Sequence, residues 1–291
     1  GDVSGNCTLI LHYRPPYQWP ALLDFYRARC LTGIETVDEH SYARTFRLPE
    51  CKGSYRISRH PDRHALIADI RCDNLGSLQQ VVAIIRQQFD LDANPDLIQA
   101  ALETHPVLSG VVQQYPGLRL PGIISEFESV IRAIAGQQVS VQAARTLLRR
   151  LGERCGETLP ANNDPQHPVQ LFPSPQRITD TALDGLGFTG KRQEWMRHIA
   201  ELYARGFTAR SGDLASSVAM LQTLPGIGEW SAHYIAMRAF GEPDAFPTAD
   251  LGLLNALKNP ERPKARQLQT LAEQWRPWRA YATFYLWQSL H

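Results

Sequence analysis

The sequence predicts an α+β fold: a small N-terminal antiparallel β-sheet domain with helices, followed by a mostly α-helical, two-lobed body. The first 90 residues contain runs of alternating apolar and polar residues broken by turn formers, which is typical of strands joined by tight turns. After Asn94-Pro95, nearly every segment instead has the apolar spacing of a helix. The 291 residues, 43% of them hydrophobic, suffice for two or three domains with a substantial core.

The N-terminal sheet and helix domain is expected over residues 1–95. Pro15-Pro16 should end its first strand, and Pro49, Gly53 and Pro61-Asp62 should separate the later strands. These breaks predict strands at 8–12, 42–48, 54–59 and 65–72, and helices at 19–30 and 78–89.

The remaining chain is expected to form two helical domains, a central one over 125–242 and a second one from 96–124 plus 243–291. The longest irregular stretch, 156–173, contains Asn162-Asn163-Asp164-Pro165 and predicts a surface loop. Helices are predicted at 96–103, 124–135, 141–151, 175–183, 190–203, 216–221, 231–240, 250–257, 264–275 and 280–290.

The charge balance gives no sign of a polyanion-binding protein. There are 30 basic and 29 acidic residues, so any site for a polyanion must come from a local patch or from backbone donors. One basic run is visible, and a run of this kind is more often a solvated face than a binding surface. It contains two acids, Glu261 and Glu273, and six cations: Lys258, Arg262, Lys264, Arg266, Arg276 and Arg279.

The five cysteines are widely spaced and include no Cys-x-x-Cys pair. That spacing argues against a disulfide framework and against a zinc or iron–sulfur site, and it favours a reduced, cytosolic compartment. No apolar run approaches 18 residues, so no membrane-spanning helix is predicted. Because the chain begins with Gly1 and not with Met, we expect its start to be either an artificial boundary or a cut from a longer chain.

The most informative segment is Leu224-Pro225-Gly226-Ile227-Gly228-Glu229-Trp230-Ser231-Ala232, a glycine-rich turn between two predicted helices. Glycines in such a turn permit positive φ and a close approach by another chain. The N-terminus of the following helix leaves backbone N–H groups without partners, and these favour an anion such as a DNA phosphate. The alternative is an ordinary helix–helix turn with a glycine C-cap.

A second signal is Asp250, which falls in the first turn of the helix that follows Pro247-Thr248. An acid at this position stabilises the helix dipole and needs no further purpose. Asp250 lies 22 residues after Gly228.

Together, the turn and the acid resemble the helix-hairpin-helix glycosylase superfamily of base-excision repair. Further segments resemble one branch of it, the bacterial DNA-3-methyladenine glycosylase II family of alkylation repair, and the resemblance covers nearly the whole chain. These segments are Tyr13-Arg14-Pro15-Pro16-Tyr17-Gln18-Trp19, Leu118-Arg119-Leu120-Pro121-Gly122, Ala135-Gly136-Gln137-Gln138-Val139-Ser140 and Trp275-Arg276-Pro277-Trp278-Arg279-Ala280-Tyr281-Ala282.

The resemblance implies that Asp250 is catalytic. Cleavage of an N-glycosidic bond builds positive charge on the sugar, which a fixed carboxylate stabilises. Bifunctional members carry a lysine nucleophile where this chain has Trp230, so a monofunctional enzyme that leaves an abasic site is implied.

The resemblance also implies a base pocket and a DNA-contacting surface. Trp230, Tyr234 and Trp287, with Phe25 closing one wall, would bind an extruded cationic base by cation–π contact. Gln138 would fill the gap left by that base, where the family carries a leucine, and Leu251 replaces an aromatic residue beside Asp250. The implied DNA contacts in the hairpin are Gly226, Ile227, Gly228 and Ser231.

The implied cofactors and partners are few. The main-chain carbonyls of Gln222, Leu224 and Ile227 would hold a structural Na⁺ or K⁺ in the hairpin, and neither a required cofactor nor an iron–sulfur cluster is expected. The expected partner is double-stranded DNA with alkylated bases, bound by a monomer in the cytoplasm at the bacterial nucleoid, with no membrane. Two alternatives stay open: a glycosylase for deaminated or oxidised bases, and a non-catalytic DNA-binding module.

Overall fold

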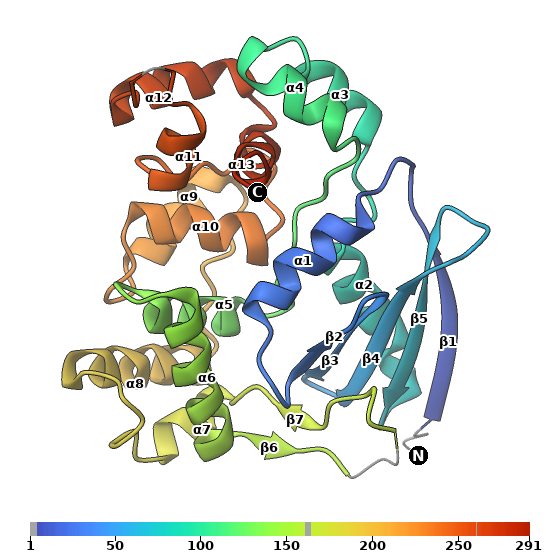
Figure 1. The fold of residues 1–291 in the computed structure, drawn as a ribbon. Coiled ribbons are helices and arrows are strands. Elements are labelled where there is room, and N and C mark those ends of the chain that lie inside the picture. The colour runs from blue at the N-terminus through green and yellow to red at the C-terminus, as the bar shows by residue number, and fades with distance from the viewer. Residues whose placement is uncertain (1–4, 161–163, 260) are drawn as a thin grey trace. The chain divides into compact units, whose positions relative to one another are not determined.

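The computed structural model describes residues 5–160, 164–259 and 261–291. The chain divides into two compact units (Figure 1). The first unit consists of residues 1–13, 19–86 and 124–208, and the second of 14–18, 87–123 and 209–291. In the described part of the chain, no helix has the length and apolar character needed to cross a bilayer.

The first unit is built on an antiparallel sheet with strand order β1-β5-β4-β3-β2. The predicted α+β class is therefore confirmed, and the four predicted strands lie within β1, β3, β4 and β5, while the short β2 was not predicted. The strands are β1 (Gly5–His12), β2 (Glu35–Val37), β3 (Ser41–Leu48), β4 (Cys51–Arg59) and β5 (Ala65–Cys72). Helix α1 (Trp19–Arg29) contacts β2 and β3, and α2 (Leu78–Gln88) buries Val81 and Ile85.

Gly53 does not break a strand, contrary to the sequence prediction. It lies inside β4 and pairs with Cys72 of β5. A Cβ at Gly53 would stand 2.0 Å from the Arg71 carbonyl oxygen, so the glycine serves the close approach of two strands.

A buried ionic cluster joins the sheet to the helical part of the first unit. Arg44 on β3 pairs with Glu128 at 2.7 Å, and Arg132 pairs with Glu35 at 2.9 Å and with Glu128 at 2.6 Å. Burial by itself would raise the pKa of Glu35, but Arg132 and Arg44 lower it to about 2. Glu128 and Arg132 lie on α5 (Glu126–Gly136), which is followed by α6 (Val141–Cys155), α7 (Pro175–Asp180) and α8 (Gly190–Ala204).

The predicted surface loop at 156–173 contains two short strands and contacts the sheet. It contains the paired strands β6 (Glu157–Thr158) and β7 (Gln170–Leu171), and the Gln170 carbonyl accepts a hydrogen bond from Thr45 Oγ1 at 2.7 Å. His167 is buried, with its Nδ1 2.9 Å from Ser54 Oγ. Asn162 and Asn163 lie outside the described residues.

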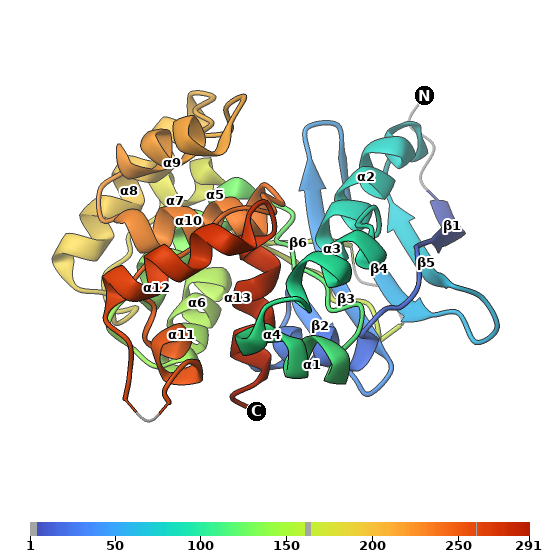
Figure 2. The same cartoon turned by 90° about the horizontal axis from the view of Figure 1, so that it is seen from above.

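The second unit is helical. Its helices are α3 (Pro95–Leu102), α4 (Pro106–Gln114), α9 (Leu214–Gln222), α10 (Glu229–Ala239), α11 (Leu251–Ala256), α12 (Ala265–Ala272) and α13 (Arg279–Gln288). Figure 2 shows α3 and α4 side by side, and α4, which was not predicted, begins with Pro106 at a position where its missing N–H costs nothing. Helix α13 contacts both α4 and α11 and is buried over residues 279–286.

The two units differ from the three-domain division expected from the sequence. The sheet and residues 124–208 share one unit, and residues 209–242 lie with 243–291 in the other. The hairpin and Asp250, assigned from the sequence to two helical domains, thus belong to the same compact unit.

Asp90 anchors α13, the helix that carries Trp287. Its Oδ2 accepts hydrogen bonds from Tyr281 Oη at 2.6 Å and from the Leu120 amide at 3.1 Å, while Arg119 Nη1 donates to the Asp90 carbonyl at 2.7 Å. Burial raises the pKa of the Asp90 carboxyl to about 6, although these donors and Arg119 partly oppose the shift.

This pKa predicts that stability falls as the pH rises. The folded state binds the Asp90 proton more tightly than the unfolded state, whose ordinary pKa is 3.8, so the stabilisation is complete below pH 3.8 and is lost as the pH passes 6. The Asp90→Asn variant keeps an oxygen acceptor but cannot ionise. From pH 4 to 7.5, we expect its free energy of unfolding to rise relative to wild type by roughly 3 kcal/mol.

Urea unfolding at pH 4, 5.5 and 7.5 checks this expectation. The control is Asp96→Asn, which makes the same change at an exposed aspartate on α3. Parallel stability profiles for wild type and Asp90→Asn would contradict it.

Candidate active site

The local backbone turns the Asp250 carboxylate back onto its own helix. Asp250 is the N-cap residue of α11, and its Oδ1 accepts a hydrogen bond from the Leu253 amide at 2.9 Å. Ala249 just before it has φ 59°, a left-handed conformation that non-glycine residues rarely adopt. Strained backbone of this kind is concentrated at functional sites.

Two tryptophans from other helices hold the same carboxylate. Trp230 Nε1 on α10 donates to Asp250 Oδ2 at 2.9 Å, and Trp287 Nε1 on α13 donates to Oδ1 at 2.9 Å. With the Leu253 amide, Oδ1 therefore accepts two hydrogen bonds and Oδ2 accepts one. Because a carboxylate offers about four lone-pair directions, Oδ2 keeps one for a further partner.

An aromatic wall stands beside this carboxylate. Trp230 and Tyr234 are stacked with ring centroids 5.1 Å apart and an interplanar angle of 14°, and Tyr234 and Trp287 are 6.2 Å apart. Trp230 is 39% exposed and so presents ring surface to solvent. The structure thus brings Asp250, Trp230, Tyr234 and Trp287 together as one cluster.

Other residues of the cluster were not predicted from the sequence. Phe284 packs edge-on against Trp287, with centroids 5.1 Å apart, and Arg238 Nη1 donates to Tyr234 Oη at 3.1 Å. A Cβ at Gly252 would stand 3.0 Å from Asp250 Oδ1 and 3.1 Å from Trp287 Nε1, so this glycine lets the indole reach the carboxylate. The sequence offered one sign of this close approach, since a glycine in the first turn of a short helix is unfavourable unless space is needed there.

The hairpin between α9 and α10 has the backbone geometry of an anion site. Gly226 has φ 80°, and Ile227 is buried beneath the turn. Among the described residues, none accepts a hydrogen bond from the amides of Glu229, Trp230 or Ser231, which open α10. A Cβ at Gly228 would meet open space, so the chain's own packing does not require a glycine there.

The predicted hairpin cation site consists of main-chain carbonyls only. The Leu224 carbonyl already accepts the Ile227 amide at 3.2 Å, and Gln222 ends α9. Carbonyl oxygens have two lone pairs and are hard ligands, so the residues present fit a Na⁺ or K⁺ ion. The site stays a prediction. Across the described ranges, no group of three His, Cys, Asp or Glu side chains could hold a metal.

Phe25 and Gln138 belong to the first unit, whereas Asp250 belongs to the second. Phe25 lies on α1 with the Arg29 guanidinium 3.7 Å above its ring centroid. Gln138 is exposed in the turn between α5 and α6 with φ 55°, and Arg192 of α8 donates to the neighbouring Gln137 carbonyl. Their roles as pocket wall and wedge remain predictions.

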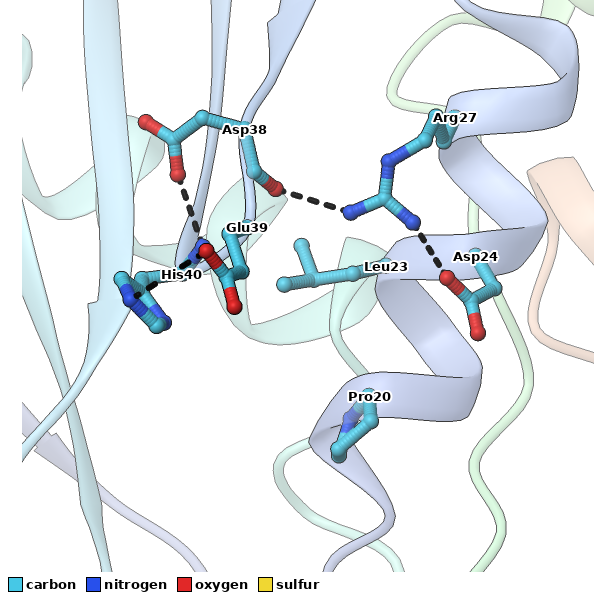
Figure 3. A pocket seen from close by; sticks show the side chains of 7 residues that line it. All are labelled: Pro20, Leu23, Asp24, Arg27, Asp38, Glu39 and His40. Carbon is cyan, nitrogen blue, oxygen red and sulfur yellow. Dashed lines mark hydrogen bonds and ion pairs between the residues drawn. The ribbon is translucent and has the colours of Figure 1, made fainter.

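A shallow cavity of about 570 Å³ in the first unit contains none of the predicted site residues (Figure 3). It lies between α1 and the turn before β3, and three carboxylates, those of Asp24, Asp38 and Glu39, line it beside Arg27. Arg27 bonds to the Asp24 side chain and donates to the Asp38 carbonyl at 2.9 Å. An acidic, internally paired surface of this kind is unsuited to the DNA backbone.

Comparisons with known proteins agree with the resemblance seen in the sequence. Residues 8–125 match the family described as the AlkA N-terminal domain. Over 284 residues the chain is 35% identical to DNA-3-methyladenine glycosylase 2 of Escherichia coli strain K12, and the alignment covers 95% of each protein. The 3-methyladenine DNA-glycosylase from Archaeoglobus fulgidus shares the fold, with a TM-score of 0.83 and 20% identity over 97% of both chains.

A further relative is longer than this chain. The chain is 35% identical over 294 residues to a probable bifunctional transcriptional activator/DNA repair enzyme AlkA of Mycobacterium tuberculosis. That alignment covers 99% of this chain but 58% of the relative, so the chain spans little more than half of that protein's length. With the identity to the Escherichia coli enzyme over almost the full length of both proteins, the chain belongs to the DNA-3-methyladenine glycosylase II family.

Proposed function

We propose that this protein is a monofunctional DNA glycosylase that removes alkylated purines, of the 3-methyladenine and 7-methylguanine type, from double-stranded DNA and leaves an abasic site. One observation carries the proposal: the Asp250 carboxylate is held by two indole N–H groups and a helix N-terminus beside a stacked aromatic wall. The matched relative from Escherichia coli is named DNA-3-methyladenine glycosylase 2, which agrees with a glycosylase that acts on methylated adenine.

The geometry suits an electrostatic mechanism. The bond from C1′ to the base nitrogen breaks, and its electron pair neutralises the cationic base, which leaves without an added proton. The positive charge that develops on the sugar lies close to Asp250, whose orientation costs no rearrangement because it is already bonded. The free lone pair of Oδ2 can then accept a proton from the water that adds to C1′.

The aromatic wall supplies selection for positive charge. An alkylated purine carries a positive ring, and the faces of Trp230 and Tyr234 attract it by cation–π interaction. The 65% exposed Leu251 beside Asp250 provides no such face, which leaves the pocket open on that side. We therefore propose that the enzyme accepts a broad range of alkylated bases, and that it selects them mainly because their own glycosidic bonds are weak.

Strand cleavage should not follow base release. A β-lyase reaction needs an amine nucleophile, and Trp230 occupies the position of the lysine in bifunctional relatives of the superfamily. No lysine occurs between Lys191 and Lys258. The abasic strand is expected to stay intact.

DNA binding is proposed to use the backbone more than side-chain charge. The first amides of α10 would hold a phosphate, the Na⁺ or K⁺ ion in the hairpin would bridge to it, and Gln138 would fill the gap left by the base. One chain supplies all the named residues, so we propose that a monomer acts on the DNA of the nucleoid.

The first prediction from the proposed function concerns Asp250→Asn. The amide cannot accept indole N–H groups on both of its heavy atoms and carries no charge, so single-turnover release of 3-methyladenine and 7-methylguanine from methylated duplex DNA should fall about 10²- to 10³-fold. Affinity for a duplex with a tetrahydrofuran abasic site should change little. If wild type releases no methylated base but binds DNA, deaminated and oxidised bases become the substrates to test.

The second prediction distinguishes two roles of Trp287: the hydrogen bond that orients Asp250 and the packing of its aromatic ring. Trp287→Phe keeps an aromatic ring but removes the donor to Asp250 Oδ1, and a hydrogen bond to a charged group corresponds to about a 10- to 100-fold effect on rate. The single-turnover rate should fall by this factor at unchanged affinity for DNA. Trp195→Phe, on α8 in the first unit, is the control and should leave the rate at the wild-type value.

The third prediction compares the two hairpin glycines. Gly226→Ala forces a side chain to φ 80° and should cost roughly 1–2 kcal/mol of stability. Gly228 has an ordinary φ of −88° and open space at its Cβ, so Gly228→Ala should unfold as wild type does yet bind DNA at least about tenfold more weakly. Thermal unfolding and DNA titration of both variants check this. Wild-type affinity in Gly228→Ala would argue against a phosphate at the hairpin.

A further inference from the structure

We propose that four cations, which lie between the end of α11 and the first turn of α12, form a second binding surface for the DNA sugar–phosphate backbone, close along the chain to the catalytic carboxylate. We call these four cations, Lys258, Arg262, Lys264 and Arg266, the basic loop. The inference rests on the proposed function, because it places the DNA strand at Asp250.

The structure separates the basic run seen in the sequence into two groups. Arg279 is buried and donates to both oxygens of Asp244, at 2.9 Å and 3.1 Å. Arg276 pairs with Glu273 at 2.7 Å and also with Asp244. These two arginines are thus paired with acids of their own unit.

The basic loop is arranged differently. All four of its cations are exposed, and within the described ranges none of their side chains forms an ion pair. One acid, Glu261, lies among them in the sequence. The segment therefore carries four positive charges against the single negative charge of Glu261.

Two of these cations occupy positions that disfavour a positive charge. Lys264 is the N-cap residue of α12, Arg266 lies in its first turn, and this turn contains no acid. The helix dipole makes an N-terminus electropositive, so it repels both side chains and adds to their potential. A bound phosphate would attract both the two side chains and the helix N-terminus, and would thereby offset their mutual repulsion.

The position of the basic loop identifies the anion. Helix α11 begins directly after Asp250 and has six residues, so at 1.5 Å per residue it ends roughly 9 Å from the catalytic residue, and Lys258 follows two residues after its end. Phosphates follow one another every 3.4 Å along the helix axis of a DNA strand. A strand whose nucleotide is extruded at Asp250 therefore carries phosphates within reach of these long side chains. Helix α11 is held on α13, the helix that also carries Trp287 (Figure 1).

The test measures the salt dependence of DNA binding by the full chain. Two variants remove two charges each: Lys258→Gln with Arg262→Gln, and Lys264→Gln with Arg266→Gln. Each phosphate contact contributes about 0.9 to the slope of log Kd against log salt concentration. We expect each variant to lower the slope by about one to two, measured by anisotropy from 50 to 250 mM KCl on a duplex with a tetrahydrofuran site.

A matched control removes two exposed cations elsewhere. Arg59 and Arg63 flank the turn between β4 and β5 of the first unit. Arg59→Gln with Arg63→Gln makes the same change in net charge, so it reports the general electrostatic effect. The Lys264 and Arg266 variant should also melt no lower than wild type, because it removes charges that oppose the helix dipole.

Each outcome is decisive. Slopes that fall in the loop variants and not in the control support the inference, including when wild type releases no methylated base and the proposed function fails. Loop variants that match the control overturn the inference even if wild type releases base. A third outcome would also overturn the inference: loop variants that bind DNA as wild type does but no longer bind a heparin column. That result would assign the basic loop to another polyanion.

Discussion

The hydrogen bonds to the Asp250 carboxylate are the interaction on which the second unit's chemistry depends. They join the start of α11, the start of α10 and the C-terminal half of α13 at one pair of oxygen atoms. A carboxylate held by three donors cannot turn away when charge develops on a substrate, and stabilisation that is already oriented is worth the most. The donors that orient Asp250 also belong to the rings of the aromatic wall, so in the proposed reaction one set of tryptophans would serve both purposes.

Much of the remaining packing in this unit supports that arrangement. Helix α13 is buried over residues 279–286 and is tied at its start by Arg279 to Asp244 and in its first turns by Tyr281 to Asp90. These bonds set the position of Trp287 at the other end of the helix. Gly252 leaves the room that its indole needs. The burial that makes the Asp90 carboxyl hard to ionise is a consequence of the same tight packing.

The near-zero net charge is consistent with how the site would hold DNA. Backbone amides at the start of α10 attract a phosphate without adding a formal charge. The cations that do exist are not spread evenly. Those near α13 are paired with acids and stabilise the fold, whereas the basic loop is unpaired among the described residues. A formal charge of +1 therefore conceals a local positive surface.

Features that depend on neighbouring residues could be read from the sequence: the α+β class, most strands and helices, and the glycine hairpin. The roles of Asp250, Trp230, Tyr234 and Trp287 were found through resemblance, since nothing local distinguishes these residues. Only the tertiary structure showed that Trp287 bonds to a carboxylate 37 residues away, that Phe284 supports it, that Gly53 lies within a strand, and which cations are paired. These contacts join residues distant in sequence, and long-range packing, which local periodicity does not encode, decides them.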